Sequence, residues 1–220
     1  GGTVVGQPLG SVQAVGLQAR EGLTPVELTL APGARIRLRG AGGVGKSSLL
    51  EVFAGLRRAF KGHISSDGRV LSRAELRTRT LLLRSEEVVA SSVMDNLRLG
   101  RFNLDEEQAW EVLREVGLDH RVRALPGGLD GKLFSDGAPL SSTERGRLGV
   151  ARALLANPEL LLIDGALDDL GPGEDEAARL RQIVLGPDRP WTVVVITGRS
   201  GVAQMCESTY ELTVRGADAD

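Results

Sequence analysis

Hydrophobic and polar positions form strand-like and helix-like stretches that alternate along much of the chain. Short, almost continuous apolar runs at residues 160–164 and 192–197 predict buried strands. The period changes to that of a helix over residues 104–116, where Asp105 is the expected N-cap, and again over residues 143–155. Strands that alternate with helices predict an α/β domain with a mostly parallel sheet.

Two parts of the chain depart from this alternation. Proline and glycine interrupt three short strand-like runs near the start, which predicts an N-terminal antiparallel β subdomain over about residues 1–39. These runs lie at residues 12–16, 26–30 and 35–39. The helical periods with intervening turn signals predict a helical subdomain over about residues 85–157. We expect a single domain over residues 1–220, with no internal repeat.

Composition excludes several classes of protein. The chain has 220 residues, 41% of them hydrophobic and 25% charged, and a net charge of -2, which is unlike a basic nucleic-acid binder. Its apolar runs are far shorter than the ~20 residues of a membrane span. A single cysteine, Cys206, cannot close an internal disulfide, so we expect a reducing, cytoplasmic setting. The start at Gly1-Gly2 resembles no signal peptide and suggests a piece of a longer chain.

The strongest motif is a glycine-rich segment at residues 40–47, G-A-G-G-V-G-K-S, which has the pattern of a phosphate-binding loop. It follows a predicted strand and begins a predicted helix over residues 47–54. Glycines allow backbone N–H groups to turn towards phosphate oxygens, and the helix N-terminus adds partial positive charge. We expect Lys46 to reach the β- and γ-phosphates and the Ser47 hydroxyl to bind Mg²⁺. The predicted nucleotide-binding residues are Gly40, Ala41, Gly42, Gly43, Val44, Gly45, Lys46, Ser47 and Ser48.

Further motifs resemble the nucleotide-binding domain of ABC transporters over nearly the whole chain. Leu140-Ser141 followed by residues 145–158 is similar to the signature helix of that family, and residues 160–164 are similar to its Walker B strand. Residues 92–100 and 125–130 resemble the exporter branch, whose domains are fused to or paired with a transmembrane domain.

The resemblance implies a fold, ligands and partners. The fold is that of an ABC-type P-loop NTPase, and the ligands are ATP or ADP with Mg²⁺ held by Ser47 and Asp164. The implied partners are a transmembrane domain and a second nucleotide-binding domain, in a homodimer or a heterodimer. The implied location is the cytoplasmic face of the inner (plasma) membrane, and no nucleic acid is expected as a partner.

Positions that carry catalysis in this family differ here. Gly165 stands where the family has a glutamate that polarises the attacking water, Gly198 where it has a histidine, and Arg84 where it has a glutamine. No aromatic residue precedes Phe53, so the usual adenine-stacking group is missing. Arg84 and Arg199 are candidates to hold a phosphate by charge-assisted hydrogen bonds. No catalytic position of the family is expected to be intact.

The signature loop is also altered. In place of the family's L-S-G-G-Q, Leu140 is followed by Ser141, Ser142, Thr143 and Glu144, so side chains replace two glycines and a negative charge is added. Ser141 and Glu144 fit a capping box, which favours the simple role of starting a helix. Residues 168–171, D-D-L-G, replace the family's S-A-L-D loop.

These observations favour the ATP-binding domain of an ABC-type exporter. It would transmit its nucleotide state to a transmembrane partner through residues 84–97, with hydrolysis very slow or absent. Two alternatives stay open: an active ATPase completed by an intact partner domain, and a structural pseudo-ATPase domain that no longer binds nucleotide. A DNA-repair ATPase is disfavoured by the acidic net charge and the exporter-like segments.

Overall fold

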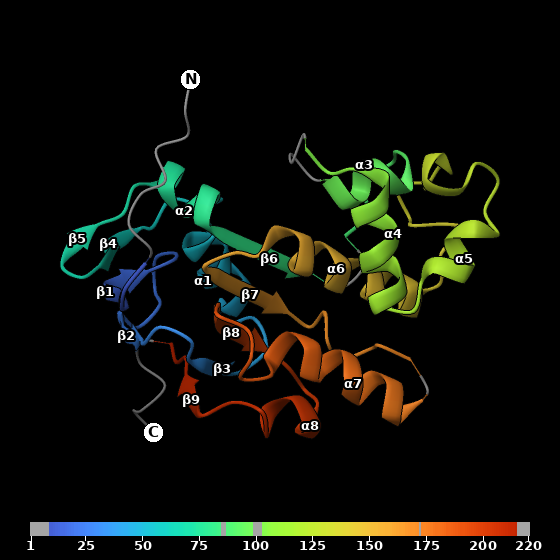
Figure 1. The fold of residues 1–220 in the computed structure, drawn as a ribbon. Helices are drawn as coiled ribbons and strands as arrows, with labels where there is room; N and C mark the ends of the chain where they lie inside the picture. Colours follow the sequence, from blue (N-terminus) through green and yellow to red (C-terminus); the bar gives the residue numbers. More distant parts are fainter. Residues whose placement is uncertain (1–8, 85–86, 99–102, 172, 215–220) are drawn as a thin grey trace.

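The computed structural model describes residues 9–84, 87–98, 103–171 and 173–214, which form two sheets and a group of helices (Figure 1). The strands are β1 (Val12–Gln18), β2 (Val26–Leu30), β3 (Arg35–Arg39), β4 (Lys61–Ser66), β5 (Arg69–Val70), β6 (Thr80–Arg84), β7 (Leu160–Asp164), β8 (Thr192–Ile196) and β9 (Ser208–Glu211). The helices are α1 (Lys46–Phe53), α2 (Arg73–Arg79), α3 (Val93–Arg98), α4 (Glu106–Glu115), α5 (Asp119–Arg123), the 3-10 turn η1 (Gly128–Asp130), α6 (Ser142–Ala156), α7 (Glu174–Leu185) and α8 (Ser200–Ala203).

The antiparallel sheet has the strand order β2-β1-β4-β5. The prediction of a β-rich edge ending at residue 39 is wrong in its boundary, because β3 belongs to the other sheet and β4 and β5 come from beyond the phosphate loop. Strand pairing extends the antiparallel sheet beyond residue 39, because β1 pairs with β4 as well as with β2, with Ala14 opposite Ile64. The hydrophobic pattern does not reveal β4, because its buried half contains two serines beside Ile64.

The second sheet is parallel, with the order β6-β7-β8-β3-β9. Its central strands are buried on both faces, which explains their continuous apolar runs. Leu160 and Leu162 of β7 pack with α1 and the antiparallel sheet, whereas Leu161 and Ile163 pack with α6, α7 and the helices before them. The sheet therefore separates two hydrophobic cores.

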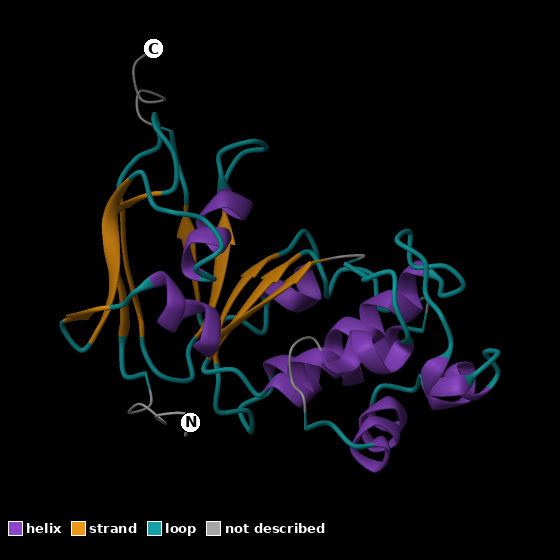
Figure 2. Cartoon of the chain, turned by 90° about the horizontal axis from the view of Figure 1, so that it is seen from above, coloured by secondary structure: helices purple, strands orange, loops and turns teal. Residues whose placement is uncertain are grey.

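The helices α3 to α6 lie between β6 and β7 in the sequence and gather at one end of the parallel sheet, away from the antiparallel sheet (Figure 2). The predicted helices are confirmed: α4 begins after Asp105, whose carboxylate accepts the Gln108 N–H at 2.9 Å, and α6 covers the predicted residues 143–155. Glu86, Leu99 and Gly100 lie outside the described residues. None of the helices that the structure describes has the length and hydrophobicity of a membrane span.

Candidate functional site

The predicted site residues lie along the carboxyl edge of the parallel sheet. Arg84 at the end of β6 is the register partner of Asp164 at the end of β7, and Asp164 is the partner of Ile196 at the end of β8. Gly40 follows β3, which pairs with β8. The fold therefore places the start of the phosphate loop on the same sheet edge as the ends of β6, β7 and β8. The family's catalytic positions lie at or just after the ends of these three strands.

The phosphate loop has the backbone that its glycines permit. Gly40 and Gly45 have φ angles of 149° and 96°, in the region that favours glycine. A Cβ at Gly40 would lie 2.5 Å from the carbonyl oxygen of Leu212, and one at Gly45 would lie 2.8 Å from the Leu23 side chain. By contrast, nothing lies within 4 Å of a Cβ built on Gly43. The loop is packed tightly at its two ends and open at its middle.

The Lys46 ammonium lies across this open loop. Its Nζ donates hydrogen bonds to the carbonyl oxygens of Gly40 at 2.8 Å and Ala41 at 2.9 Å. Among the residues that the structure describes, no carboxylate forms an ion pair with Lys46. A cavity of about 220 Å³ lies beside it, lined by Arg20, Gly43, Gly45, Lys46, Ser47 and Ser48. The amine is bound by neutral carbonyls that an incoming phosphate could replace.

Two oxygen donors fit Mg²⁺, the metal ion that the fold implies. Ser47 is exposed at the start of α1, and Asp164 ends β7, two strands away from β3 in the sheet. Hydroxyl and carboxylate oxygens are ligands that Mg²⁺ accepts, and Mg²⁺ usually keeps several waters with one or two protein ligands. The donor set is therefore chemically suitable for a nucleotide-bound Mg²⁺.

Arg84 is already engaged by a carboxylate. Its Nη2 lies 2.6 Å from the Oε1 of Glu51 on α1, and the other carboxylate oxygen of Glu51 lies 2.7 Å from Arg57. This arrangement uses the Arg84 charge to connect the end of β6 to the phosphate-loop helix. The second candidate arginine, Arg199, is exposed and is the N-cap residue just before α8.

Gly165 lacks the carboxylate of a catalytic glutamate, and its backbone conformation is also unfavourable for a glutamate. Gly165 has a φ of 70°, its N–H donates to the Ile196 carbonyl at 3.0 Å, and its own carbonyl accepts the Asp168 N–H at 3.0 Å. Residues other than glycine are strained in this conformation. A glutamate placed here would meet a backbone that does not suit it.

We therefore expect Gly165→Glu to lower the free energy of unfolding by about 1 kcal/mol and to leave ATP hydrolysis undetectable. Gly165→Asn is the matched control, since asparagine tolerates positive φ better and adds no carboxylate. Urea unfolding and steady-state phosphate release measure the two effects. A Gly165→Glu protein as stable as the parent, with at least tenfold faster hydrolysis, would contradict this expectation.

Asp168 is a residue whose position the sequence did not explain. Its carboxylate accepts a hydrogen bond from the Gly198 N–H at 3.0 Å and another from the Thr197 hydroxyl. It thereby ties the segment after β7 to the segment after β8. Gly198, at the family's histidine position, is held through its backbone. The signal in the sequence was an acidic residue in place of the serine of the family's S-A-L-D loop.

The altered signature segment is used to start α6. The Glu144 N–H donates to the Ser141 hydroxyl at 3.2 Å and the Ser141 N–H donates to the Glu144 carboxylate at 2.8 Å, which confirms the predicted capping box. The Glu144 carboxylate also pairs with Arg121 at 3.3 Å, and the Ser142 hydroxyl donates to Asp169 at 3.1 Å. Thr143, the remaining predicted signature residue, lies half-buried in the first turn. The negative charge added by Glu144 is balanced inside this chain.

A buried arginine, which the sequence analysis did not single out, connects α6 to α3. Arg152 is 5% exposed, and its guanidinium donates to the Asn96 backbone carbonyl at 2.9 Å, to the Asn96 side chain at 2.5 Å and to the Glu87 carbonyl. The Asn96 amide in turn exchanges hydrogen bonds with the backbone of Val89 at 2.8 and 2.9 Å. Burial lowers the pKa of Arg152 to about 10, so it stays charged at neutral pH. The network fixes residues 87–96 onto α6.

A cavity of about 280 Å³ lies between the end of α1, β6 and α6. Arg84, Arg152 and the exposed Leu56 are among the residues that line it. It therefore touches both the Arg84–Glu51 ion pair and the buried network on α6.

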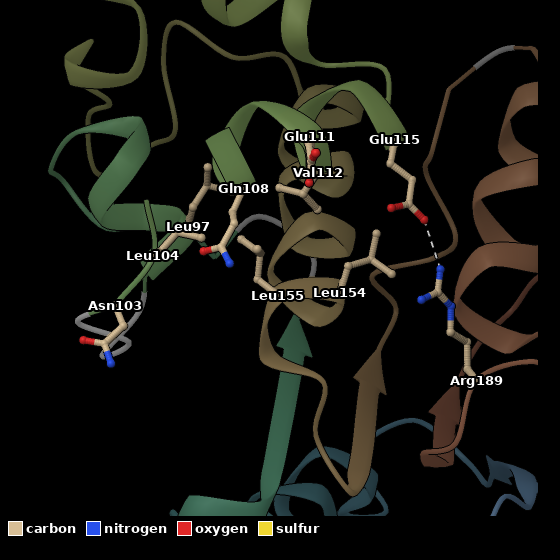
Figure 3. Close-up of a pocket in the computed structure, with 10 residues that line it drawn as sticks. All are labelled: Leu97, Asn103, Leu104, Gln108, Glu111, Val112, Glu115, Leu154, Leu155 and Arg189. Carbon is tan, nitrogen blue, oxygen red and sulfur yellow. Dashed lines mark hydrogen bonds and ion pairs between the residues drawn. The ribbon is translucent and has the colours of Figure 1, made fainter. Parts of the chain in front are cut away.

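A larger cavity, of about 710 Å³, opens between α3, α4 and the end of α6 (Figure 3). Its lining is Leu97, Asn103, Leu104, Gln108, Glu111, Val112, Glu115, Leu154, Leu155 and Arg189. The Glu115–Arg189 ion pair, at 3.0 Å, closes one side. None of these residues belongs to the phosphate loop, so this cavity is separate from the candidate nucleotide site.

Comparison with known proteins agrees with this geometry. The family model described as ABC transporter matches residues 23–168. An aliphatic sulfonates import ATP-binding protein, SsuB of Cupriavidus pinatubonensis, is 37% identical over 154 residues, which are 69% of this chain and 48% of that protein. A probable multidrug resistance ABC transporter ATP-binding/permease protein, YheH of Bacillus subtilis, is 31% identical over 153 residues, 68% of this chain and 23% of that protein.

A solved structure has the same fold. It is described as a bacterial Atm1-family ABC exporter with ATP bound, and it matches with a TM-score of 0.79 and 23% identity over 96% of this chain and 38% of that chain. The chain thus spans about half or less of the length of these relatives. Because the family model covers well over half of the residues, and the phosphate loop lies at the sheet edge where such a domain carries it, this chain belongs to the ABC transporter family as an ATP-binding domain.

Proposed function

We propose that this chain binds ATP or ADP with Mg²⁺ at residues 40–48, hydrolyses ATP very slowly or not at all, and passes its nucleotide state to a transmembrane partner of an exporter. The observation that carries the proposal is the contrast between two places on one sheet edge. The phosphate loop is open and its Lys46 lacks a carboxylate partner among the described residues, whereas Gly165 offers neither a carboxylate nor a backbone suited to one.

The size of the catalytic loss supports slow turnover. A positioned general base contributes typically ~10² to 10⁴ in rate. Gly165 and Gly198 have no side chain that could act as a base, and Arg84 is paired with Glu51. Effects of groups that act together are not additive, so the combined loss is smaller than the product of the separate losses. Nucleotide binding precedes the chemical step and does not depend on these groups.

The described surface around Arg84 and residues 87–97 supports the proposal of a transmembrane partner. Leu56 and Val89 are 53% and 49% exposed, and the cavity between α1, β6 and α6 opens beside Leu56. Arg84 lines that cavity and holds Glu51, which lies on the helix that begins at Lys46. A movement of α1 on nucleotide binding would therefore be transmitted to this surface through the Arg84–Glu51 ion pair.

Several finer assignments belong to the same proposal. The relatives include import and multidrug resistance proteins, so the export direction rests on the segments at residues 92–100 and 125–130. The location is the cytoplasmic face of the inner membrane. The assembly is a homodimer or heterodimer of nucleotide-binding domains. Ser142 and Glu144 form contacts within this chain, so we expect the signature segment to bind the nucleotide of the facing domain more weakly than is usual in the family.

Calorimetric titration of the chain with Mg-ATP and Mg-ADP, together with a phosphate-release assay, tests the proposal. We expect saturable binding of both nucleotides and no detectable release of phosphate. An absence of saturable heat would favour the structural pseudo-ATPase alternative. Rapid hydrolysis by the chain alone would contradict the proposed slow turnover, and hydrolysis that appears only after mixing with an intact domain would favour the active ATPase completed by a partner.

A further inference from the structure

A second cation lies beside the phosphate loop. Arg20 follows β1, and its guanidinium donates a hydrogen bond to the carbonyl oxygen of Gly43. Its Nε lies 3.5 Å from the position of a Cβ built on Gly45. Arg20 and Lys46 are two of the residues that line the same cavity of about 220 Å³. A residue from outside the motif thus contributes to the wall of the loop.

The charge of this cavity is positive. Among the described residues that line it none is acidic, and within the part of the chain that the structure describes neither Arg20 nor Lys46 takes part in an ion pair. Arginine presents a planar fork of N–H donors that suits phosphate oxygens. The Arg20 side chain is exposed, and its hydrogen bond within the described residues goes to a neutral carbonyl, so turning to an anion would break no ion pair among them.

The described lining of the cavity offers no aromatic ring on which a nucleobase could stack. None of its described lining residues is aromatic. The nearest aromatic residue after the loop, Phe53, is fully buried in the core, and Trp191 is buried with its indole N–H bound to the Val184 carbonyl. Stacking on an aromatic ring changes affinity by a factor of about 2 to 10, and that factor is missing on this wall.

We propose that Arg20 is a second phosphate-binding cation and that the site recognises the polyphosphate with little preference for the base. The proposal rests on the proposed function that the loop binds nucleotide. Its ligand class is any Mg²⁺-bound nucleoside triphosphate, with inorganic tripolyphosphate as the minimal member. Arg20 would then select ligands by the negative charge of their phosphates. Arg20 and Lys46 are the two cations among the described residues that line the cavity.

The test is a titration of the 220-residue chain with Mg-ATP, Mg-GTP, Mg-CTP and Mg-tripolyphosphate. For the parent we expect dissociation constants for the three nucleotides within about threefold of one another. For Arg20→Ala we expect all four ligands to bind about tenfold more weakly, which is a loss typical of one charge-assisted hydrogen bond. Arg20→Lys should recover part of this loss. Arg114→Ala, which removes an exposed arginine from α4, should leave all four dissociation constants unchanged.

Each outcome decides between distinct statements. Saturable binding by the parent that Arg20→Ala leaves unchanged would overturn this inference and keep the proposed function. A loss confined to the nucleotides, with tripolyphosphate unaffected, would show that Arg20 contacts the base and would also overturn it. A parent that prefers ATP by more than tenfold would refute the indifference to the base. A parent that binds none of the four ligands would remove the proposed function itself.

Discussion

Arg152→Ala is expected to lower the free energy of unfolding by about 2 to 4 kcal/mol. The substitution removes a buried guanidinium that donates to Asn96 and to the Glu87 carbonyl, and it leaves these acceptors and a cavity behind. For a chain of this size the loss corresponds to a fall of roughly 5 to 15 °C in the thermal midpoint. Calorimetry or urea unfolding of the purified variant measures it.

The matched control for this variant is Arg179→Ala. Arg179 is exposed on α7 and, among the described residues, donates to the carbonyl of Glu115 at 2.9 Å. We expect this control to stay within about 0.5 kcal/mol of the parent. Equal stabilities for the two variants would mean that the Arg152–Asn96 network does not hold α6 against α3.

Lys46→Ala is expected to weaken Mg-ATP binding by about 100-fold, or about 2.7 kcal/mol. The physical reason is that the Lys46 ammonium is the motif's own cation, and it can exchange its bonds to the Gly40 and Ala41 carbonyls for phosphate oxygens. Calorimetric titration measures the loss, and thermal unfolding in the absence of ligand checks that the variant is folded. Lys46→Met, which keeps the aliphatic stem, should lose as much affinity.

Lys132→Ala provides the matched control, because Lys132 is exposed and lies outside the phosphate loop, before α6. Its effect on the dissociation constant should be less than twofold. If Lys46→Ala bound Mg-ATP as tightly as Lys132→Ala, the nucleotide would be held somewhere other than at residues 40–48, and the assignment of the loop would be wrong.

The sequence predicted those elements whose signal is local. The apolar runs of β7 and β8 are buried on both faces, and α4 and α6 begin at the residues whose side chains can cap them. The phosphate loop was recognisable because its glycines and Lys46 occupy fixed positions. These features need no knowledge of distant contacts.

Other features were missed, either because their hydrophobic signal is weak or because they depend on distant contacts. Helix α2 is polar, with only Leu76 buried, although Ser72 and Glu75 form a capping box that an S-x-x-E search would have found. The buried arginines have no local signal in a chain rich in exposed arginine. Arg35 donates to the backbone carbonyls of Leu185 and Gly186, about 150 residues away. Burial lowers its pKa, and hydrogen bonds to carbonyls compensate for the loss of water.

Some site residues have contacts that spacing alone could not give. The pairing of Arg84 with Glu51 and the bonds from Thr197 and Gly198 to Asp168 join elements that meet only at the carboxyl edge of the sheet. The sequence identified these positions as departures from a family pattern. The fold adds that the replacements contact one another rather than leaving gaps.

The position of β3 implies that the phosphate loop takes its final shape only late in the synthesis of the chain. This strand leads into the phosphate loop and lies between β8 and β9 in the described sheet, and both neighbours are synthesised more than 150 residues later. The Leu212 carbonyl, which packs against Gly40, emerges later still. A ribosome-bound intermediate that ends before residue 192 therefore has the loop sequence without the paired strands that shape it. A nucleotide that binds the loop as proposed would stabilise the finished domain, but it would find no formed site in such an intermediate.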